Sequence, residues 1–531
     1  MHIFRREFFK IAGGGLAGTV AGNAAPEGVQ AQPYGSSLAS GVYDVRTFGA
    51  KGNGTAIDTP AINRAIQAAS EGGGGTVLFA AGTYASFSIH LRSNVAIYLE
   101  QGATILAASV PDGGSTAGGY YDAAEPNAPW ENYQDYGHNH WHNSLLWGEN
   151  LQNVSILGPG LIWGKGLSRG GKELPHAETP GMGNKSIALK NCHNVILRDF
   201  SILQGGHFGI LATGVDNLTI DNLKIDTNRD GMDVDCCRNV RISNCSVNSP
   251  WDDGICLKSS FALGYARATE NVTISNCYVT GAYELGSMLD GTWKRWPADA
   301  KTPRTGRIKC GTESNGGFKN ITIANCVFEG CGGFALESVD GATLEDITIT
   351  GITMRDCVNT PLFLRLGSRM RGPAGVPVGS LKRILVSNVS SFNSRSTYGG
   401  AGLISGIPGH PIQDIQFANL YMQYRAKGTS GTSAVAPPED EQKYPEPSMF
   451  GTIPGSGFFI RNVKNISLSN VELTWQGEDA RPVFWMQNVE GAEFFRVKTP
   501  KRIIAPVFSL HQVEDFHVVE LHNLKDCVSI K

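Results

Sequence analysis

A short phrase recurs along this chain: an asparagine, an aliphatic residue, any residue, and a second aliphatic residue. Copies begin at Asn153, Asn194, Asn217, Asn239, Asn271, Asn320 and Asn465. Up to Asn320 they recur at intervals of roughly 20–50 residues, and one longer interval precedes Asn465. Such a period is typical of solenoids, in which one structural unit is stacked many times. The alternation of aliphatic and polar residues after each asparagine indicates a short β-strand with one buried face.

Such a strand cannot form a core alone, because only one of its faces is apolar. Stacking each strand on its equivalents completes the core, so the sequence predicts an all-β parallel β-helix with its turn asparagines in a ladder. Three copies continue into Asn-Cys, at Cys245, Cys277 and Cys326. We interpret these cysteines as one inward-facing column of small apolar side chains rather than as metal or redox groups.

One helix is expected before the coils. Asp58-Thr59-Pro60 opens a run with apolar residues at helical spacing that ends at Gly72, and these are typical start and stop signals. A helix there would cover the open end of the solenoid, as terminal repeats must. The stretch 424–457, rich in Pro, Gly and Ser, is expected to be an extended loop. We predict one β-helix domain over residues 42–531.

Composition excludes several classes of protein. Glycine is abundant, with 66 residues, but it has no three-residue period, and 41% hydrophobic against 18% charged residues is typical of a globular chain. The formal net charge is −3, which argues against a nucleic-acid partner. No stretch reaches the ~20 continuous apolar residues of a membrane span. We expect a monomer.

The amino terminus predicts export. Arg5-Arg6 and Phe8-Phe9-Lys10 precede an uncharged stretch rich in Gly and Ala. This order is that of a signal peptide, and the paired arginines resemble a twin-arginine export signal. We predict that residues 1–31 are the signal and that the mature protein is periplasmic or secreted.

Three aspartates carry the candidate chemistry. If the strand that contains Met232 is aligned with the strand that contains Ile255, Asp230 stacks on Asp253, and Asp252 lies at the bend just before it. Carboxylates this close repel one another, and repulsion raises at least one pKa, as a general acid requires. Turn aspartates that cap backbone amides, or a calcium site, are the alternatives.

Two segments here resemble a known family. Asn228-Arg229-Asp230-Gly231-Met232-Asp233 is similar to the Asn-Thr-Asp-Gly-Ile-Asp signature of the polygalacturonase family of glycoside hydrolases, and Asp252-Asp253-Gly254-Ile255 begins a similar second signature. The resemblance extends over residues 42–370 and implies a single-stranded, right-handed parallel β-helix that hydrolyses α-linked galacturonic acid with inversion. It implies Asp252 as the general acid and Asp230 and Asp253 as the pair that activates water. No metal or other cofactor is needed for that chemistry.

Two family motifs are missing. Thr305-Gly306-Arg307 stands where a Gly-His-Gly is expected, and Ala335 and Glu337 stand where an Arg-x-Lys pair would hold the substrate carboxylate. We predict that Arg307 and Lys309, one coil earlier, face outward beside the aspartates, because strand residues alternate in direction. With Lys258 and Arg365 they form the candidate substrate subsite. Ion pairing of the basic residues with Glu337 and Asp235 is the alternative, and Glu337 would suit a neutral sugar.

Aromatic residues outside the coils complete the candidate list. The insertion 282–304 contains Trp293, which we predict to stack on a sugar face. His207 is a candidate to replace the missing histidine. His138, His140 and His142 alternate within an aromatic segment, which we interpret as a cleft wall rather than as a set of metal ligands.

The sequence therefore predicts an exported inverting glycoside hydrolase that cleaves pectic or related acidic polysaccharide. One alternative is a β-helix polysaccharide lyase, with Arg307 or Lys309 as the base and calcium on the aspartates. Another is a β-helix protein that binds glycans without cleaving them.

Overall fold

The computed structural model describes residues 41–110, 120–169, 179–297, 299–396, 398, 400–425, 428, 435–500 and 505–522, together with the backbone of 527–530. The expected export signal at residues 1–31 lies outside these ranges. Residues 41–531 form one compact unit. None of the helices in the described ranges is both long enough and apolar enough to cross a membrane.

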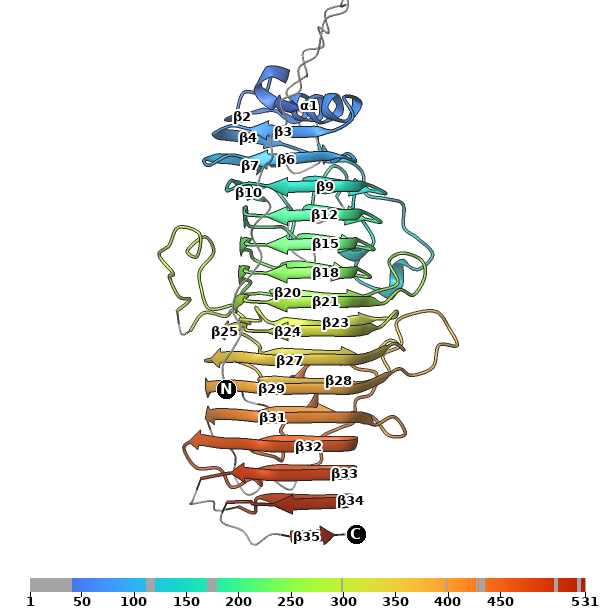
Figure 1. Cartoon of the computed structure of the whole chain (residues 1–531), viewed down its shortest axis with the longest axis vertical. Helices are drawn as coiled ribbons and strands as arrows, with labels where there is room; N and C mark the ends of the chain where they lie inside the picture. Colours follow the sequence, from blue (N-terminus) through green and yellow to red (C-terminus); the bar gives the residue numbers. More distant parts are fainter. Residues whose placement is uncertain are drawn as a thin grey trace, which may run out of the picture. The chain divides into compact units, whose positions relative to one another are not determined.

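The unit is built from successive coils, and each coil adds one strand to each of three rows of parallel strands (Figure 1). The first, which we call the site row, consists of β5 (Ile89–His90), β8 (Leu146–Glu149), β11 (Lys185–Lys190), β14 (Phe208–Thr213), β17 (Asp230–Asp235), β20 (Ile255–Ser259), β23 (Ile308–Ser314), β26 (Phe334–Ser338), β28 (Leu362–Leu366) and β30 (Gly402–Ser405).

The second, the asparagine row, consists of β1 (Val42–Asp44), β3 (Gly75–Phe79), β6 (Val95–Leu99), β9 (Gln152–Leu157), β12 (His193–Arg198), β15 (Asp216–Asp221), β18 (Arg238–Ser243), β21 (Thr269–Ser275) and β24 (Phe318–Ala324). The third, the short row, consists of β2 (Asn53–Ile57), β4 (Gly82–Ser86), β7 (Ala103–Ala107), β10 (Leu161–Trp163), β13 (Ser201–Leu203), β16 (Lys224–Asp226), β19 (Ser246–Asn248), β22 (Tyr278–Thr280) and β25 (Val327–Glu329).

In the later coils the strands of different rows run together into long strands. These are β27 (Thr343–Arg355), β29 (Ser380–Ser394), β31 (Ile412–Arg425), β32 (Phe458–Gln476), β33 (Phe484–Lys498) and β34 (Phe508–Val519), and β35 (Cys527–Ile530) ends the unit antiparallel to β34. The described ranges contain four 3-10 turns outside the rows: η1 (Val45–Phe48), η2 (Glu131–Tyr133), η3 (Tyr136–His138) and η5 (Pro447–Phe450).

The predicted helix is present as α1 (Thr59–Glu71), with Pro60 in its first turn and Gly72 at its end. Its buried face consists of the alanines and isoleucines at helical spacing, and it packs against the first strands, β1, β3 and β5 (Figure 1). Asp58 lies at the N-terminal cap, but its carboxylate accepts hydrogen bonds from the amides of Lys51 and Gly52 rather than from the helix. That α1 protects the end of the solenoid remains a prediction.

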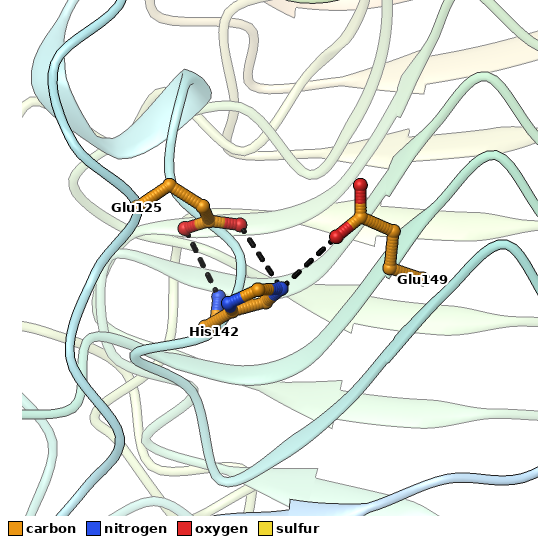
Figure 2. Close-up of side chains that lie close together, drawn as sticks. All are labelled: Glu125, His142 and Glu149. Atoms are coloured by element: carbon orange, nitrogen blue, oxygen red, sulfur yellow. Dashed lines mark hydrogen bonds and ion pairs between the residues drawn. The ribbon is translucent and has the colours of Figure 1, made fainter.

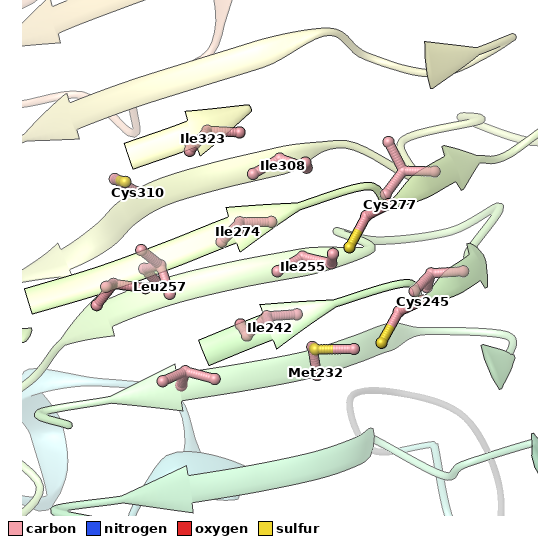
Figure 3. Packing of buried hydrophobic residues seen from close by; sticks show 14 of the residues in the cluster. Met232, Ile242, Cys245, Ile255, Leu257, Ile274, Cys277, Ile308, Cys310 and Ile323 are labelled. Atoms are coloured by element: carbon pink, nitrogen blue, oxygen red, sulfur yellow. The ribbon is translucent and has the colours of Figure 1, made fainter. Parts of the chain in front are cut away.

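Aliphatic and cysteine side chains form the core between the rows (Figure 3). Ile242, Ile274 and Ile323 stack in register along the asparagine row. Cys245, Cys277 and Cys326 precede stacked strands of the short row and are all buried. The predicted inward column of cysteines is therefore present, and the ten described cysteines are free and buried.

The asparagines form the predicted ladder. Asn217 donates from its side-chain amide to Asn194 at 3.0 Å, Asn194 donates to Asn153 at 3.0 Å, and Asn320 donates to Asn271 at 2.8 Å. Their backbones have φ values of 54–59°, and asparagine tolerates this left-handed region better than most residues. The repeated asparagine is thus explained by backbone conformation and by stacking together.

Candidate active site

The three aspartates of the sequence motifs meet where the chain bends from the short row into the site row. The pairing of Met232 with Ile255 brings Asp230 level with Asp253, and the amide of Gly231 donates to the Asp253 carbonyl at 2.9 Å. One carboxylate oxygen from each of Asp230, Asp252 and Asp253 lies within 4.8 Å of the others. The arrangement is the one that aligning the two strands predicts.

Asp253 is held ionised by two basic residues of the next coil. Arg307 Nε donates to Asp253 Oδ1 at 2.7 Å, and Lys309 Nζ lies 3.4 Å from Asp253 Oδ2. Burial alone would raise the pKa of Asp253, but Arg307, Lys309 and Lys258 lower it to about 2. Arg307 and Lys309 therefore face outward beside the aspartates, as strand alternation predicts.

Asp252 has the opposite tendency. Its pKa is raised, first by its removal from bulk water and then by the charge of Asp253, although Arg229 Nε at 3.3 Å opposes the rise. A third of its side chain remains exposed, whereas the side chain of Asp253 is 3% exposed. The pKa of Asp230 is raised well above its usual value by burial and by Asp252 and Asp233. Two adjacent aspartates thus favour opposite protonation states.

Lys258 lies beside this group but is already paired. Its Nζ is 2.9 Å from Glu313 Oε2 and 3.7 Å from Asp233 Oδ2, and all three side chains are nearly inaccessible. Glu337 lies on β26, which pairs with the strand of Lys309, and its Oε2 is 3.4 Å from Lys309 Nζ. Burial raises the pKa of Glu337 to about 7 despite Lys309 and Arg307. The alternative of ion pairing is thus observed for Glu337. Asp235, in contrast, accepts hydrogen bonds from the backbone amide and hydroxyl of Ser260.

Arg365 does not join the aspartates. It pairs in register with Glu337, as predicted, but its guanidinium donates to Ser405 Oγ at 3.0 Å and to the Glu439 carbonyl at 2.8 Å. It also lies over the ring of Phe450. The expectation that Arg365 contributes to a basic subsite is therefore corrected, because a later loop takes up its donors.

That loop, residues 435–450, crosses the site row and was not assigned to the site from sequence; we call it the strap. Tyr444 Oη accepts from Lys309 Nζ at 3.4 Å and from Thr312 Oγ1 at 2.9 Å. Glu446 binds both terminal nitrogens of Arg307 and also accepts from Asn359 at 3.4 Å. Tyr444 and Glu446 are 87 to 139 positions from these partners, so no local pattern could identify them.

The aromatic segment 130–142 lies along the other flank of the site row. Trp130 and Tyr133 pack edge-on against Phe261, and Trp141 Nε1 donates to Thr213 Oγ1 at 3.1 Å. The Arg371 side chain secures the segment by donating to the Tyr133 carbonyl at 2.8 Å. This placement agrees with the interpretation of the segment as a wall.

The alternating histidines do not share one site. His142 lies between Glu125 and Glu149, with its Nε2 3.0 Å from Glu149 Oε2 (Figure 2). His140 stacks on Tyr136, and His138 packs edge-on against Phe208. The cluster of Glu125, His142 and Glu149 offers three ligand atoms within 4.8 Å, as do the three aspartates. In the cluster around His142, the Lys190 ammonium also lies 3.0 Å from the Glu149 carboxylate and supplies a positive charge.

His207 is buried one coil before Asp230, level with Arg229. Burial, together with the charge of Arg229, lowers its pKa well below the usual value, so the ring is neutral. Neither ring nitrogen has a hydrogen-bond partner among the described residues. The structure thus places His207 three coils before Thr305-Gly306-Arg307, the segment that stands where the Gly-His-Gly motif is expected.

The two tryptophans of the insertion 282–304 lie in different surroundings, and sugar stacking by Trp293 stays a prediction. Trp293 packs edge-on against Tyr278 and Tyr283, with ring centroids 5.8 and 5.1 Å apart, on the side of the short row. Trp296 instead packs edge-on against Trp251 at 5.3 Å. Trp251 directly precedes Asp252, so this pair is the aromatic surface adjoining the aspartates.

Comparison with known proteins supports this description. Residues 176–292 match a family model described as "Right handed beta helix region", and residues 42–114 match one described as "Rhamnogalacturonase A/epimerase, pectate lyase-like". The handedness implied by the sequence resemblance agrees with the first match.

Two curated proteins are similar in sequence. A probable polygalacturonase of Vitis vinifera is 26% identical over 380 residues, which cover 65% of this chain and 72% of that protein. An exo-poly-alpha-D-galacturonosidase of Dickeya chrysanthemi is 27% identical over 305 residues, 46% of this chain and 47% of that protein.

Two solved structures share the fold. A family 28 exopolygalacturonase of Yersinia enterocolitica superposes with a TM-score of 0.59 at 17% identity, covering 90% of this chain and 78% of that one. An exopolygalacturonase of Thermotoga maritima gives a TM-score of 0.52 at 17% identity, covering 72% and 87%. The family models, the sequence relatives and the shared fold agree: the chain has a right-handed parallel β-helix fold and is similar in sequence to polygalacturonases.

Proposed function

We propose that the chain is a glycoside hydrolase that cleaves pectic polysaccharide with inversion of the anomeric carbon. Asp252 protonates the oxygen of the leaving sugar. Asp253 takes a proton from the attacking water, and Asp230, whose raised pKa favours its protonated form, positions that water. The names of the curated relatives support the class of substrate.

The observation that carries the proposal is the pair of neighbouring aspartates with opposed protonation. General acid catalysis needs a carboxyl group that keeps its proton, and activation of water needs one that has lost it. Asp252 has a raised pKa and an exposed side chain, whereas Arg307 and Lys309 hold the pKa of Asp253 at about 2. One site therefore contains both an acid and a base.

The same contacts argue against the lyase alternative, which needs a neutral base. Burial acts to lower the pKa values of Arg307 and Lys309, but Asp253 and the neighbouring acids raise both well above their usual range. Both residues therefore remain protonated. The positive charges around the aspartates also neutralise their negative charge, as a bound calcium ion would.

The test is incubation of the protein with homogalacturonan, with rhamnogalacturonan and with neutral glycans, using Asp252→Asn as the control. We expect new reducing ends without ultraviolet absorbance, and a loss of about 10²–10⁴-fold in rate in the variant. Calcium-dependent absorbance would establish a lyase instead. No product from any glycan, with binding equal in both proteins, would favour a glycan-binding protein.

Proton NMR of the first product formed tests inversion. The closest carboxylate oxygens lie within 4.8 Å, whereas inverting and retaining enzymes differ in the separation of whole carboxyl groups, about 6.5–9.5 against 5–5.5 Å. We expect a β-configured product from an α-linked substrate. An α product at the earliest times would contradict the inverting mechanism.

We also propose that the protein acts outside the cytoplasm as a monomer. The paired arginines and the small-residue stretch within residues 1–31 support export. Fusion of residues 1–31 to a reporter, with Arg5-Arg6 replaced by lysines as the control, tests export. Light scattering of the purified protein tests the oligomeric state.

A further inference from the structure

Each of the three nitrogens of the Arg307 guanidinium donates to a carboxylate of the chain itself. Its Nε donates to Asp253 at 2.7 Å, and its two terminal nitrogens donate to the two oxygens of Glu446. Two parallel hydrogen bonds of this kind are how arginine recognises a free carboxylate. Glu446 thus makes the contact that an acidic sugar would make if it bound Arg307.

Lys309 is no more available than Arg307. Its ammonium lies 3.4 Å from Asp253, from Glu337 and from Tyr444 Oη, and its side chain is 2% exposed. Arg307 and Lys309 contribute two positive charges, and Asp253, Glu337 and Glu446 bring three carboxyl groups. Even when Glu337 is protonated, the carboxylates of Asp253 and Glu446 balance the two positive charges. No positive charge is then left over to bind the carboxylate of a substrate.

The strap holds Glu446 in this position from several directions. Asn359 donates to its Oε2, the strap's Tyr444 bonds Lys309 and Thr312, and η5 begins directly after Glu446. Glu446 nevertheless keeps 29% of its side chain exposed, whereas Arg307 keeps 3%. The exposed face beside Asp253 is therefore that of a carboxylate, and the cation lies behind it.

We propose that Glu446 is a specificity-determining residue. Its carboxylate occupies Arg307 in place of a substrate carboxylate, so the sugar unit bound beside Asp253 is uncharged. An ionised uronate there would meet Glu446 rather than a free cation, whereas a neutral sugar can donate its hydroxyls to the same carboxylate. This inference rests on the proposed hydrolase site and adds the charge of one sugar unit to it.

The experiment uses two ligands that differ in charge alone at each sugar: a galacturonate trisaccharide and its methyl-esterified form. Binding is measured by calorimetry in full-length Asp252→Asn, which holds the ligands without cleaving them. The same measurements are made after adding Glu446→Gln, which keeps the shape of the side chain and removes its charge. The matched control is Glu439→Gln, which changes another strap carboxylate that lies 3.4 Å from Arg461.

We expect Glu446→Gln to shift the ratio of the two affinities at least tenfold toward the acidic trisaccharide and Glu439→Gln to leave it unchanged. Glu446→Asp is a second variant, which draws the carboxylate back from Arg307, and we expect a smaller shift in the same direction. An unchanged ratio in a folded Glu446 variant, or an equal shift in the control, overturns the inference. Failure of the hydrolase proposal would be seen separately, as an absence of cleavage by the wild-type protein.

Discussion

The asparagine row and the site row are built from the same coils, yet their polar residues behave in opposite ways. In the asparagine row many amides bond an asparagine at the equivalent position of the neighbouring coil, as Asn217 does with Asn194. In the site row each charged group bonds a residue of another kind, as Asp253 does with Arg307. A repeat satisfies its own polar groups, so polar residues that depart from the repeat are the ones to examine for function.

The two rows also differ in the energetic cost of their polar groups. The ladder amides are exposed, and an exposed hydrogen bond contributes little to stability. Arg307, Lys309, Asp253 and Glu337 are buried, and buried charges cost several kcal/mol each unless they are well paired. A chain selected only for stability would not keep such a cluster, which supports a catalytic or binding role.

The largest difference in rate between the two rows is expected when one aspartate in each row is replaced by asparagine. Asp253→Asn removes the group that activates water, so we expect the rate to fall by about 10³-fold. Asp221→Asn makes the same change in the asparagine row, where Asp221 accepts hydrogen bonds from Asn244 and Ser243. We expect it to alter the rate by less than twofold. Initial rates on the glycan that the wild-type protein cleaves, with thermal unfolding to confirm folding, check both.

Equal losses of rate in the two variants would mean that catalysis depends no more on the site row than on the asparagine row. A loss in Asp253→Asn accompanied by unfolding would assign Asp253 a structural role. A folded and inactive Asp253→Asn beside an active Asp221→Asn would confirm the contrast.

The sequence predicted what depends on repetition. The asparagine phrase predicted the parallel rows, the ladder and the cysteine column, because each copy repeats the same local conformation. Aligning two copies brought Asp230 and Asp253 together and turned Arg307 outward beside them. In each case the length of the coils sets how many residues separate the two partners. The spacing of the repeated phrase gives that length.

The sequence could not predict what the loops supply. Glu446 and Tyr444 belong to a strap that was expected to be a loop, but nothing in its composition tells which strand it crosses. The register of Arg365 was predicted but its contacts were not, because the strap carbonyls that bind it are about 75 residues further along the chain. Trp293 and Trp296 lie in one insertion, and only the fold shows that Trp296 is the one that reaches Trp251.

The buried carboxyl group of Glu337 gives a smaller but measurable difference between the rows. The pKa of Glu337 is about 7 in the folded chain, against 4.5 for an ordinary glutamate, so the folded state favours the protonated form. Its contribution to stability is present below pH 4.5 and is lost as the pH rises through 7. We therefore expect Glu337→Gln to be about 3 kcal/mol more stable than the wild type at pH 8 and nearly equal to it at pH 4.

Urea unfolding at the two pH values measures this difference. Glu270→Gln is the matched change in the asparagine row, where Glu270 pairs with Arg238 at 3.0 Å on the surface. We expect it to alter the free energy of unfolding by at most about 1 kcal/mol at either pH. A Glu337→Gln variant that is destabilised at pH 8 would contradict the prediction and would mean that the ion pair with Lys309 outweighs the cost of burial.

The smallest effect expected is a shift in the pH profile on removal of Arg229. Its Nε lies 3.3 Å from Asp252, and its positive charge lowers the pKa of that acid. Asp252 must be protonated to act, so the alkaline limb of kcat/KM reports its pKa. Arg229→Gln raises that pKa, and we expect the alkaline limb to move up by about half a pH unit, since both side chains are partly exposed. The acid limb should stay in place, because the charges that lower the pKa of Asp253 come from Arg307, Lys309 and Lys258.

Arg238→Gln is the control for this last change, because it removes an arginine from the asparagine row, where Arg238 pairs with Glu270. Its pH profile should match that of the wild type. Added salt should shrink the difference between Arg229→Gln and the wild type, since a partly exposed ion pair is screened. If Asp252 were a base rather than an acid, the acid limb would move and the alkaline limb would stay. Which limb of the pH profile moves therefore decides which of the two adjacent aspartates gives the proton and which takes it.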